Sequence, residues 1–147
     1  MKPIRHVLCA TDFSTTSRRA LDAATALAKS SNAELTILHV LASPVVVPEQ
    51  YFDAAIIAQL DKRGRAWSLR ELQKLSRRTT RAGVETTVLV RPGDPAEQIV
   101  RASKAAKVDL IVTGTHGRSG LKRLFLGSVA QKVVALASCP VLTVRGA

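Results

Sequence analysis

The sequence predicts an α/β protein built on one open, mainly parallel sheet with helices on both faces. Segments rich in branched apolar residues alternate with segments of helical periodicity, in the order β-α-β-α-β-α-β-α-β. Hydrophobic residues make up 46% of the chain and aromatic residues only 3%, so the core must be aliphatic, which suits helices packed on a parallel sheet. The 147 residues are close to the usual size of a single domain, and we expect one domain over residues 1–147.

The first strand and helix are predicted at residues 4–10 and 15–30. The strand is rich in branched residues and stops at a polar turn, Thr11-Asp12-Phe13-Ser14, whose last residue is a good helix N-cap. Small and apolar residues such as Ala20 and Ala24 then recur at helical spacing, and Ser30-Ser31-Asn32 ends the helix.

The second strand is predicted at residues 34–40 and a long helix at residues 51–81. The proline-containing, Val-rich loop between them, residues 42–50, is either a lid or a passive connection. Apolar residues of the long helix approximate one face, which Leu69 and Leu72 widen, and its Arg and Lys residues form a solvated face. The apolar face comprises Ile56, Leu60, Gly64, Trp67 and Leu75.

The remaining elements are strands at residues 84–90, 109–113 and 139–145 and helices at residues 96–107 and 128–138. Asp94 caps the third helix before a proline at its first position. Residues 109–113 are nearly all apolar in their middle, which indicates a central strand. Ligands of such sheets gather at the carboxyl ends of the strands, where the strand order reverses. With a strand order of 3-2-1-4-5, residues 11–14 and the loop after the fourth strand would flank that point.

Charge and cysteine content restrict the classes of partner and compartment. The formal net charge of +11 favours anionic partners and non-specific nucleic-acid binding at low salt, although the scattered cations also fit an idle basic surface. Cys9 and Cys139 fall at opposite ends of different strands, too far apart to bridge, which fits a reducing cytoplasm. We find no signal peptide and no apolar run near the roughly 20 residues of a membrane span, so we expect a cytoplasmic protein with no membrane partner.

The loop after the fourth strand carries glycines and basic residues in a pattern that suits phosphate. Glycine stands at positions 114, 117 and 127 with serine at 128, a G-x2-G-x9-G-S spacing, and neither a Walker A loop nor a GxGxxG fingerprint is present. Glycines allow close backbone approach and positive φ, and the helix N-terminus at Ser128 supplies free N–H groups.

These motifs resemble the universal stress proteins, in the subgroup that carries the nucleotide-binding motif. The resemblance covers essentially the whole chain and rests on residues 10–14, 38–40, 114–118, 127–129 and 139–144. It implies a Rossmann-like fold of the adenine nucleotide alpha hydrolase type, with five parallel strands in the order 3-2-1-4-5. It also implies a homodimer through the last strand, at Val141, Leu142, Thr143 and Val144.

The resemblance further implies a site for ATP, or ADP or AMP, with Mg²⁺ as an optional companion. Gly114, His116 and Gly117 would run beside ribose and phosphates, and Gly127, Ser128 and Val129 would offer N–H groups and a hydroxyl to the phosphate chain. Asp12 would meet the ribose or the metal and Val40 the adenine, with Thr11 beside them and Arg118 screening phosphate charge. Two local alternatives remain, since Asp12 could only shape a turn and Ser128 could only cap its helix.

Three functions remain open at this stage, and the first is favoured. It is a nucleotide-binding regulatory dimer of the stress response with little or no turnover, because we identify no catalytic base near the phosphates. The second is a slow ATPase or self-phosphorylating protein, with Thr115, Ser119 or Ser128 as acceptor. The third is a basic protein that binds acidic partners independently of nucleotide. Specific nucleic-acid binding is not expected, because so few aromatic residues cannot form a stacking platform.

Overall fold

A computed structural model describes residues 2–42, 50, 53–116 and 126–146 of the chain. Five strands form one parallel sheet in the order β3-β2-β1-β4-β5, which confirms the predicted fold class and strand order. The strands are β1 (His6–Ala10), β2 (Glu34–Leu41), β3 (Thr86–Pro92), β4 (Leu110–Gly114) and β5 (Val141–Val144).

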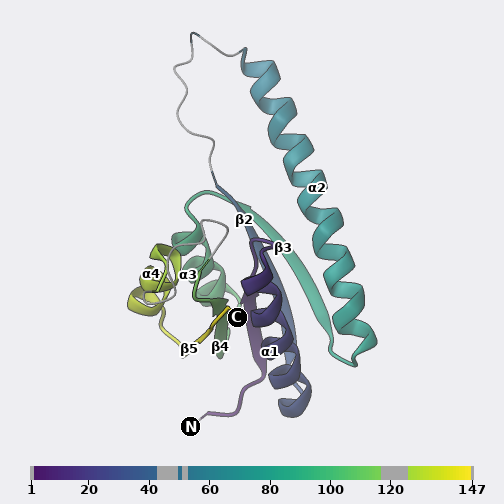
Figure 1. The fold of residues 1–147 in the computed structure, drawn as a ribbon, viewed down its shortest axis with the longest axis vertical. Helices are drawn as coiled ribbons and strands as arrows, with labels where there is room; N and C mark the ends of the chain where they lie inside the picture. The colour runs from purple at the N-terminus through teal and green to yellow at the C-terminus, as the bar shows by residue number, and fades with distance from the viewer. Residues whose placement is uncertain (1, 43–49, 51–52, 117–125, 147) are drawn as a thin grey trace.

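Four helices cover the two faces of the sheet and make a three-layer molecule (Figure 1). They are α1 (Thr15–Ser31), α2 (Ala54–Arg81), α3 (Pro95–Ala105) and α4 (Ser128–Leu136). Helices α1 and α2 pack on one face, and α3 and α4 on the other. No helix in the described ranges is long and apolar enough to cross a bilayer.

The alternation of side chains along the central strands divides the core in two. Val7 and Cys9 of β1 point to the α1/α2 face, whereas Leu8 and Ala10 point to the α3/α4 face. All four are buried, because β1 has a strand on each side and helices above and below. A strand in this position is apolar on both faces, as the continuous apolar run predicts.

Local capping signals predicted most helix ends correctly. The Ser14 hydroxyl accepts from the backbone N–H of Ser17 at the start of α1, and Asn32 ends this helix in a left-handed conformation. Asp94 caps α3 with Pro95 at the first position. The third strand was predicted to end before Pro92, but β3 includes this residue, because the last position of an edge strand needs no backbone donor.

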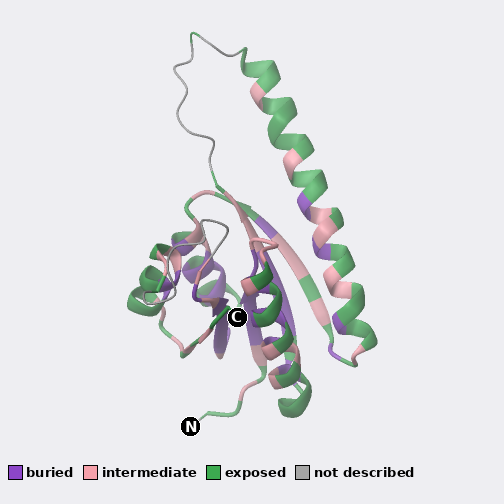
Figure 2. Ribbon diagram, in the orientation of Figure 1, coloured by how far each residue is buried: buried purple, intermediate pink, exposed green. Residues whose placement is uncertain are grey.

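The predicted apolar face of α2 is correct in the second half of the helix, where Leu72 is buried and Leu69 and Leu75 pack against the core, and wrong in the first half. The buried residues of this helix are Ser68, Leu72 and Thr79, whereas Ile56, Leu60 and Trp67 are exposed. Figures 1 and 2 show the cause, since the first half of α2 extends past the end of the sheet and only the second half packs on it. Most of the Val-rich loop, residues 43–49, lies outside the described residues, so neither of its predicted roles is tested.

Both cysteines are free, as expected. Cys9 is fully buried, and this burial raises the pKa of its thiol to about 12. Cys139 is half-buried, and desolvation raises the pKa of its thiol as well. Raised pKa values keep both groups as thiols near neutral pH, where they act as small apolar residues.

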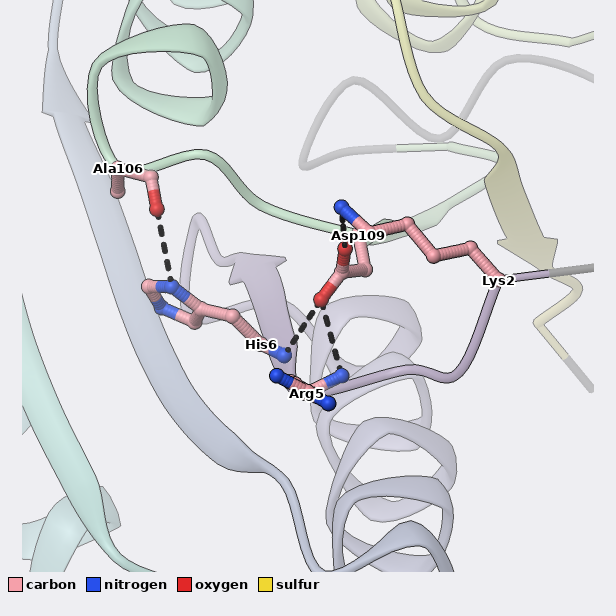
Figure 3. Close-up of polar contacts among 5 residues, drawn as sticks. All are labelled: Lys2, Arg5, His6, Ala106 and Asp109. Atoms are coloured by element: carbon pink, nitrogen blue, oxygen red, sulfur yellow. Dashed lines mark hydrogen bonds and ion pairs between the residues drawn. The ribbon is translucent and has the colours of Figure 1, made fainter.

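Asp109, just before β4, fastens the start of β1 (Figure 3). Its Oδ2 accepts the backbone N–H groups of Arg5 at 2.9 Å and His6 at 3.0 Å, and Lys2 Nζ lies 3.6 Å from Oδ1. The hydrogen bond from Arg5 is the main cause that holds the pKa of this carboxyl below its usual value, against the opposing effect of desolvation. The carboxylate therefore closes the amino-terminal end of the β1/β4 pair.

We predict that Asp109→Asn lowers the free energy of unfolding near pH 7 by about 1–2 kcal/mol, because the amide binds the two N–H groups less strongly than a carboxylate does. A carboxyl whose pKa falls on folding stabilises the protein above its unfolded pKa of about 3.9 and loses this contribution as the pH falls. The difference from wild type should therefore shrink below about pH 4 in denaturant titrations. Asp61→Asn, on an exposed position of α2, is the control; a difference at Asp109 that stays constant with pH would contradict the assignment.

Candidate nucleotide-binding site

A cavity of about 520 Å³ lies at the carboxyl ends of β1, β2 and β4, against the start of α3 and α4. Its volume is in the usual range for small-molecule pockets. Eight of the ten predicted binding residues line it, and Gly117 and Arg118 lie outside the described residues. The eight are Thr11, Asp12, Val40, Gly114, His116, Gly127, Ser128 and Val129.

The strand order explains why residues so far apart in the chain meet here. From β1 the chain proceeds to β2 and β3 on one side, and β4 and β5 lie on the other side. The connections that leave β1 and β4 therefore run to opposite faces of the sheet and open a crevice between them. This brings the turn after β1 and the glycine loop after β4 to the same cavity.

Two side-chain oxygens hold the turn after β1. Thr11 Oγ1 accepts from the backbone N–H of Phe13 at 3.1 Å and lies 3.0 Å from Ser17 Oγ. Asp12 Oδ1 accepts from the backbone N–H of Ser14 at 3.0 Å. Asp12 therefore does shape a turn, and because it also lines the cavity, the structural role and a binding role are compatible.

Phe13 connects this turn to the opposite face of the sheet. Its φ of 65° is the left-handed conformation, which is unfavourable for a bulky residue and needs support from its surroundings. Its ring centroid lies 4.6 Å from that of His39 and 5.3 Å from that of Trp67, edge-on to the latter. His39 Nδ1 lies 2.8 Å from the carbonyl oxygen of Thr11. Sequence analysis missed this cluster, because no local pattern predicts positive φ at an aromatic residue.

The N-terminus of α4 forms another wall of the cavity. Gly127 is the N-cap, so Ser128 is the first helical residue and not the cap that we predicted. The backbone N–H of Gly127 donates to the carbonyl oxygen of Thr115 at 2.7 Å, which places the helix end against the loop after β4. The first N–H groups of a helix have no partner within it, so Ser128 and Val129 bring anion-binding groups to the cavity wall.

The structure describes two glycines of the motif, Gly114 and Gly127, and each stands where there is no room for a side chain. A Cβ on Gly114 would lie 2.8 Å from Thr16 Cγ2, and one on Gly127 would lie 3.0 Å from the carbonyl oxygen of Thr115. Neither glycine has the positive φ that we considered in the sequence, since Gly127 has φ −61°. Each glycine therefore allows two backbone segments to approach closely at the cavity edge.

His116 offers a polar group that sequence analysis did not anticipate. Its Nδ1 lies 3.0 Å from Thr115 Oγ1, whereas its Nε2 is buried and has no hydrogen-bond partner within the described structure. The family resemblance implied only that this residue runs beside ribose and phosphates. A buried polar atom without a partner is costly, and a ligand oxygen in the cavity would supply one for Nε2.

The opposite part of the lining is apolar. Leu38 and Val40 of β2 contribute to it, together with Ala42, Pro95 and Ile99. Of these five residues we predicted only Val40, although Pro95 and Ile99 are four residues apart and share one face of α3. Such a surface suits a flat, weakly polar ring.

Acidic groups are scarce in the cavity. Asp12 is the one carboxylate among the described lining residues. The described part of the chain also contains no group of three His, Cys, Asp or Glu residues that could hold a metal ion. The described lining thus combines hydrogen-bond donors and apolar surface with the carboxylate of Asp12.

Comparison with known proteins agrees with this geometry. The family model described as "Universal stress protein family" matches residues 3–145. The chain belongs to the universal stress protein family. It is 41% identical to the universal stress protein YxiE of Bacillus subtilis, over 95% of this chain and 97% of the relative. It is 34% identical to the universal stress protein MJ0531 of Methanocaldococcus jannaschii, over 96% of this chain and 82% of that one.

Solved structures of the family share the fold. The M. jannaschii protein MJ0577 superposes with a TM-score of 0.88 at 26% identity, and 99% of each chain is covered. A universal stress protein solved in complex with cAMP superposes with a TM-score of 0.73 at 27% identity, and 98% of each chain is covered. At least one family member similar to this chain therefore binds an adenine nucleotide.

We predict that Thr11→Val lowers the free energy of unfolding by about 1–3 kcal/mol, because it leaves the Phe13 N–H without its acceptor. Since Phe13 touches Trp67, the sole tryptophan, the emission of the folded variant should also change. Denaturant titration followed by tryptophan fluorescence measures both effects. Thr15→Val, an exposed position in the first turn of α1, is the control; equal effects of the two substitutions would show that Thr11 does not hold the turn.

Proposed function

We propose that this universal stress protein binds an adenine nucleotide, ATP above all, in the described cavity and acts as a regulatory protein with little or no turnover. One observation carries the proposal: a single cavity joins an apolar end to a phosphate-type end made by glycines and a helix N-terminus. Adenine and phosphates require these two environments at the opposite ends of one site.

The lining suggests a direction for the nucleotide. Adenine would lie on Val40, Ala42 and Ile99, and the phosphates would lie at Gly127 and Ser128. His116 Nε2, between β4 and the N-terminus of α4, would donate to a ribose or phosphate oxygen. The family member solved with cAMP supports an adenine nucleotide as ligand.

Asp12 is the residue for a metal that accompanies the nucleotide. Magnesium usually binds one or two carboxylates and completes its shell with phosphate oxygens and water. A single carboxylate at the cavity wall fits this arrangement, in which Mg²⁺ would arrive with ATP. A choice of ATP over ADP or AMP would then depend on how many phosphates reach the start of α4.

The described residues favour binding over phosphoryl transfer. Phosphoryl transfer requires a positioned nucleophile and metal ligands around the γ-phosphate. Thr115, one of the acceptors considered from the sequence, is 5% exposed, and its hydroxyl is bonded to His116. We therefore propose that nucleotide occupancy itself, rather than hydrolysis, is the regulatory signal, in a cytoplasm whose reducing state fits the two free thiols.

We predict that Ser128→Ala lowers the affinity for ATP about tenfold in calorimetric titration, which corresponds to the loss of one hydrogen bond. Gly127→Val should reduce binding further, because its side chain meets the carbonyl oxygen of Thr115 at the cavity edge. Ser138→Ala, beyond the other end of α4, is the matched control. If both site variants bind ATP as tightly as wild type does, the proposed site is wrong. The absorbance of the purified protein at 260 nm independently shows whether nucleotide is retained through purification.

We also propose that two copies assemble through β5. This strand is at the end of the sheet order, and one of its edges has no strand partner within the described sheet. Leu142 is 37% exposed, and Val141 and Val144 are half-buried, so the edge is apolar. An exposed apolar edge of this kind favours pairing with another chain.

We predict that wild type sediments as a dimer at micromolar concentration and that Leu142→Asp sediments as a monomer, because a charge on the edge opposes pairing. Leu136→Asp, on an exposed position of α4, adds the same charge outside the proposed interface and should remain dimeric. A monomeric wild type, or a dimer that Leu142→Asp leaves intact, would contradict assembly through β5.

A further inference from the structure

One stripe of α2 is exposed along the whole helix. Its residues follow one another in steps of four and three positions, so they share one side of the helix. All of them are exposed, and none is acidic. The stripe comprises Ile56, Leu60, Arg63, Trp67, Arg70, Lys74, Arg77 and Arg81.

The first half of this stripe is mostly apolar and largely exposed within the described structure, and the edge of the Trp67 ring contacts Phe13. Ile56 is 50% exposed, Leu60 57% and Trp67 43%. The first half of α2 extends past the sheet, and Figure 2 shows this part of the helix exposed on most of its surface. Scattered apolar residues on a surface are common, but three large ones in line on a projecting helix mark an interaction surface.

Cations accompany these apolar residues. Helix α2 carries eight Lys and Arg residues against two Asp and Glu residues, a net charge of +6 and more than half of the +11 of the chain. Lys74 pairs with Glu71 at 2.9 Å, but the Lys74 side chain is 63% exposed, so water screens this pair and the surface remains basic. Arg18 and Arg19, in the neighbouring α1, are also exposed and add to the positive charge of this layer.

This combination selects among three possible occupants. A second copy of α2 would bring a charge of +6 against +6, which opposes pairing of these helices. Nucleic acid would use the cations, but Ile56 and Leu60 offer no stacking surface to its bases. An anionic bilayer surface uses both properties, because apolar side chains enter the acyl boundary while Arg and Lys meet the headgroup phosphates.

We propose that the exposed stripe of α2 docks on an anionic lipid surface, with the helix in the plane of the membrane. Ile56, Leu60 and Trp67 would enter the interface, and the basic residues of the stripe would hold the headgroups. The sequence led us to expect no membrane partner, because no apolar run is long enough to span a bilayer. Surface docking needs no such run, since it depends on amphipathicity and charge.

The test is flotation of the full chain with unilamellar vesicles of phosphatidylglycerol, compared with vesicles of phosphatidylcholine. Binding is expected to the anionic vesicles alone, with a blue shift of the Trp67 emission and quenching by lipid brominated on its acyl chains. Arg63→Gln/Arg70→Gln should weaken vesicle binding about thirtyfold, because each cation near an anionic surface contributes about a fivefold gain in affinity. Ile56→Ser/Leu60→Ser should weaken it about tenfold or more and abolish the quenching.

The matched control removes two cations from the opposite face of the molecule. Lys104→Gln/Lys132→Gln, on exposed positions of α3 and α4, should bind vesicles nearly as wild type does. If the control variant loses as much affinity for anionic vesicles as Arg63→Gln/Arg70→Gln does, binding depends only on net charge and the proposal is overturned. Absence of binding to anionic vesicles would also overturn it. A third outcome would assign the surface to nucleic acid instead. In this outcome the protein does not bind vesicles but binds a duplex oligonucleotide in a salt-dependent manner, and Arg63→Gln/Arg70→Gln weakens that binding. Unchanged circular dichroism of the variants excludes unfolding as the cause.

Discussion

The hydrogen bonds of Thr11 hold the turn on which both faces of the molecule depend. This turn leaves β1 in the middle of the sheet, and Thr11 and Asp12 together bond three backbone or side-chain groups within it. On one face the turn forms a wall of the cavity, and on the other it presents the Phe13 ring to His39 and Trp67. The left-handed Phe13 is tolerated because both its N–H and its ring have partners.

The sheet order then determines where a ligand can bind. Because β1 and β4 are neighbours and their connections leave on opposite faces, the crevice at their carboxyl ends remains open. Gly114 lets the end of β4 approach Thr16 of α1, and Gly127 lets the start of α4 approach the loop after β4, since a Cβ at either position would collide with these neighbours. The glycine spacing of the motif is therefore a packing requirement as well as a signature of phosphate binding.

The features of the fold and site that depend on short-range patterns could be predicted from the sequence. Apolar runs and capping residues such as Ser14 and Asp94 predicted the elements and their order, and the motif predicted eight residues that meet in one cavity. Sequence analysis failed where the outcome depends on distant parts of the chain. Helical periodicity located the apolar residues of α2 but not the end of the sheet beneath them, so it placed the exposed Ile56 and Leu60 on one face with Leu75, which does pack on the core. The buried Nε2 of His116 likewise follows from the packing around the cavity and has no signal in the sequence.

Trp67 connects the stripe of α2 to the turn that lines the cavity. Its edge rests on Phe13, next to the residues that line the cavity, while 43% of its surface remains exposed in the stripe of α2. A ligand that tightens the turn after β1 and a surface that immobilises Trp67 would act on the same ring contact. Thermodynamic linkage requires that any such effect be reciprocal. If bound nucleotide changes the affinity of the protein for the lipid surface by some factor, the lipid surface changes the affinity for nucleotide by the same factor. The aromatic contact between Phe13 and Trp67 is thus the shortest physical connection between the two proposed sites.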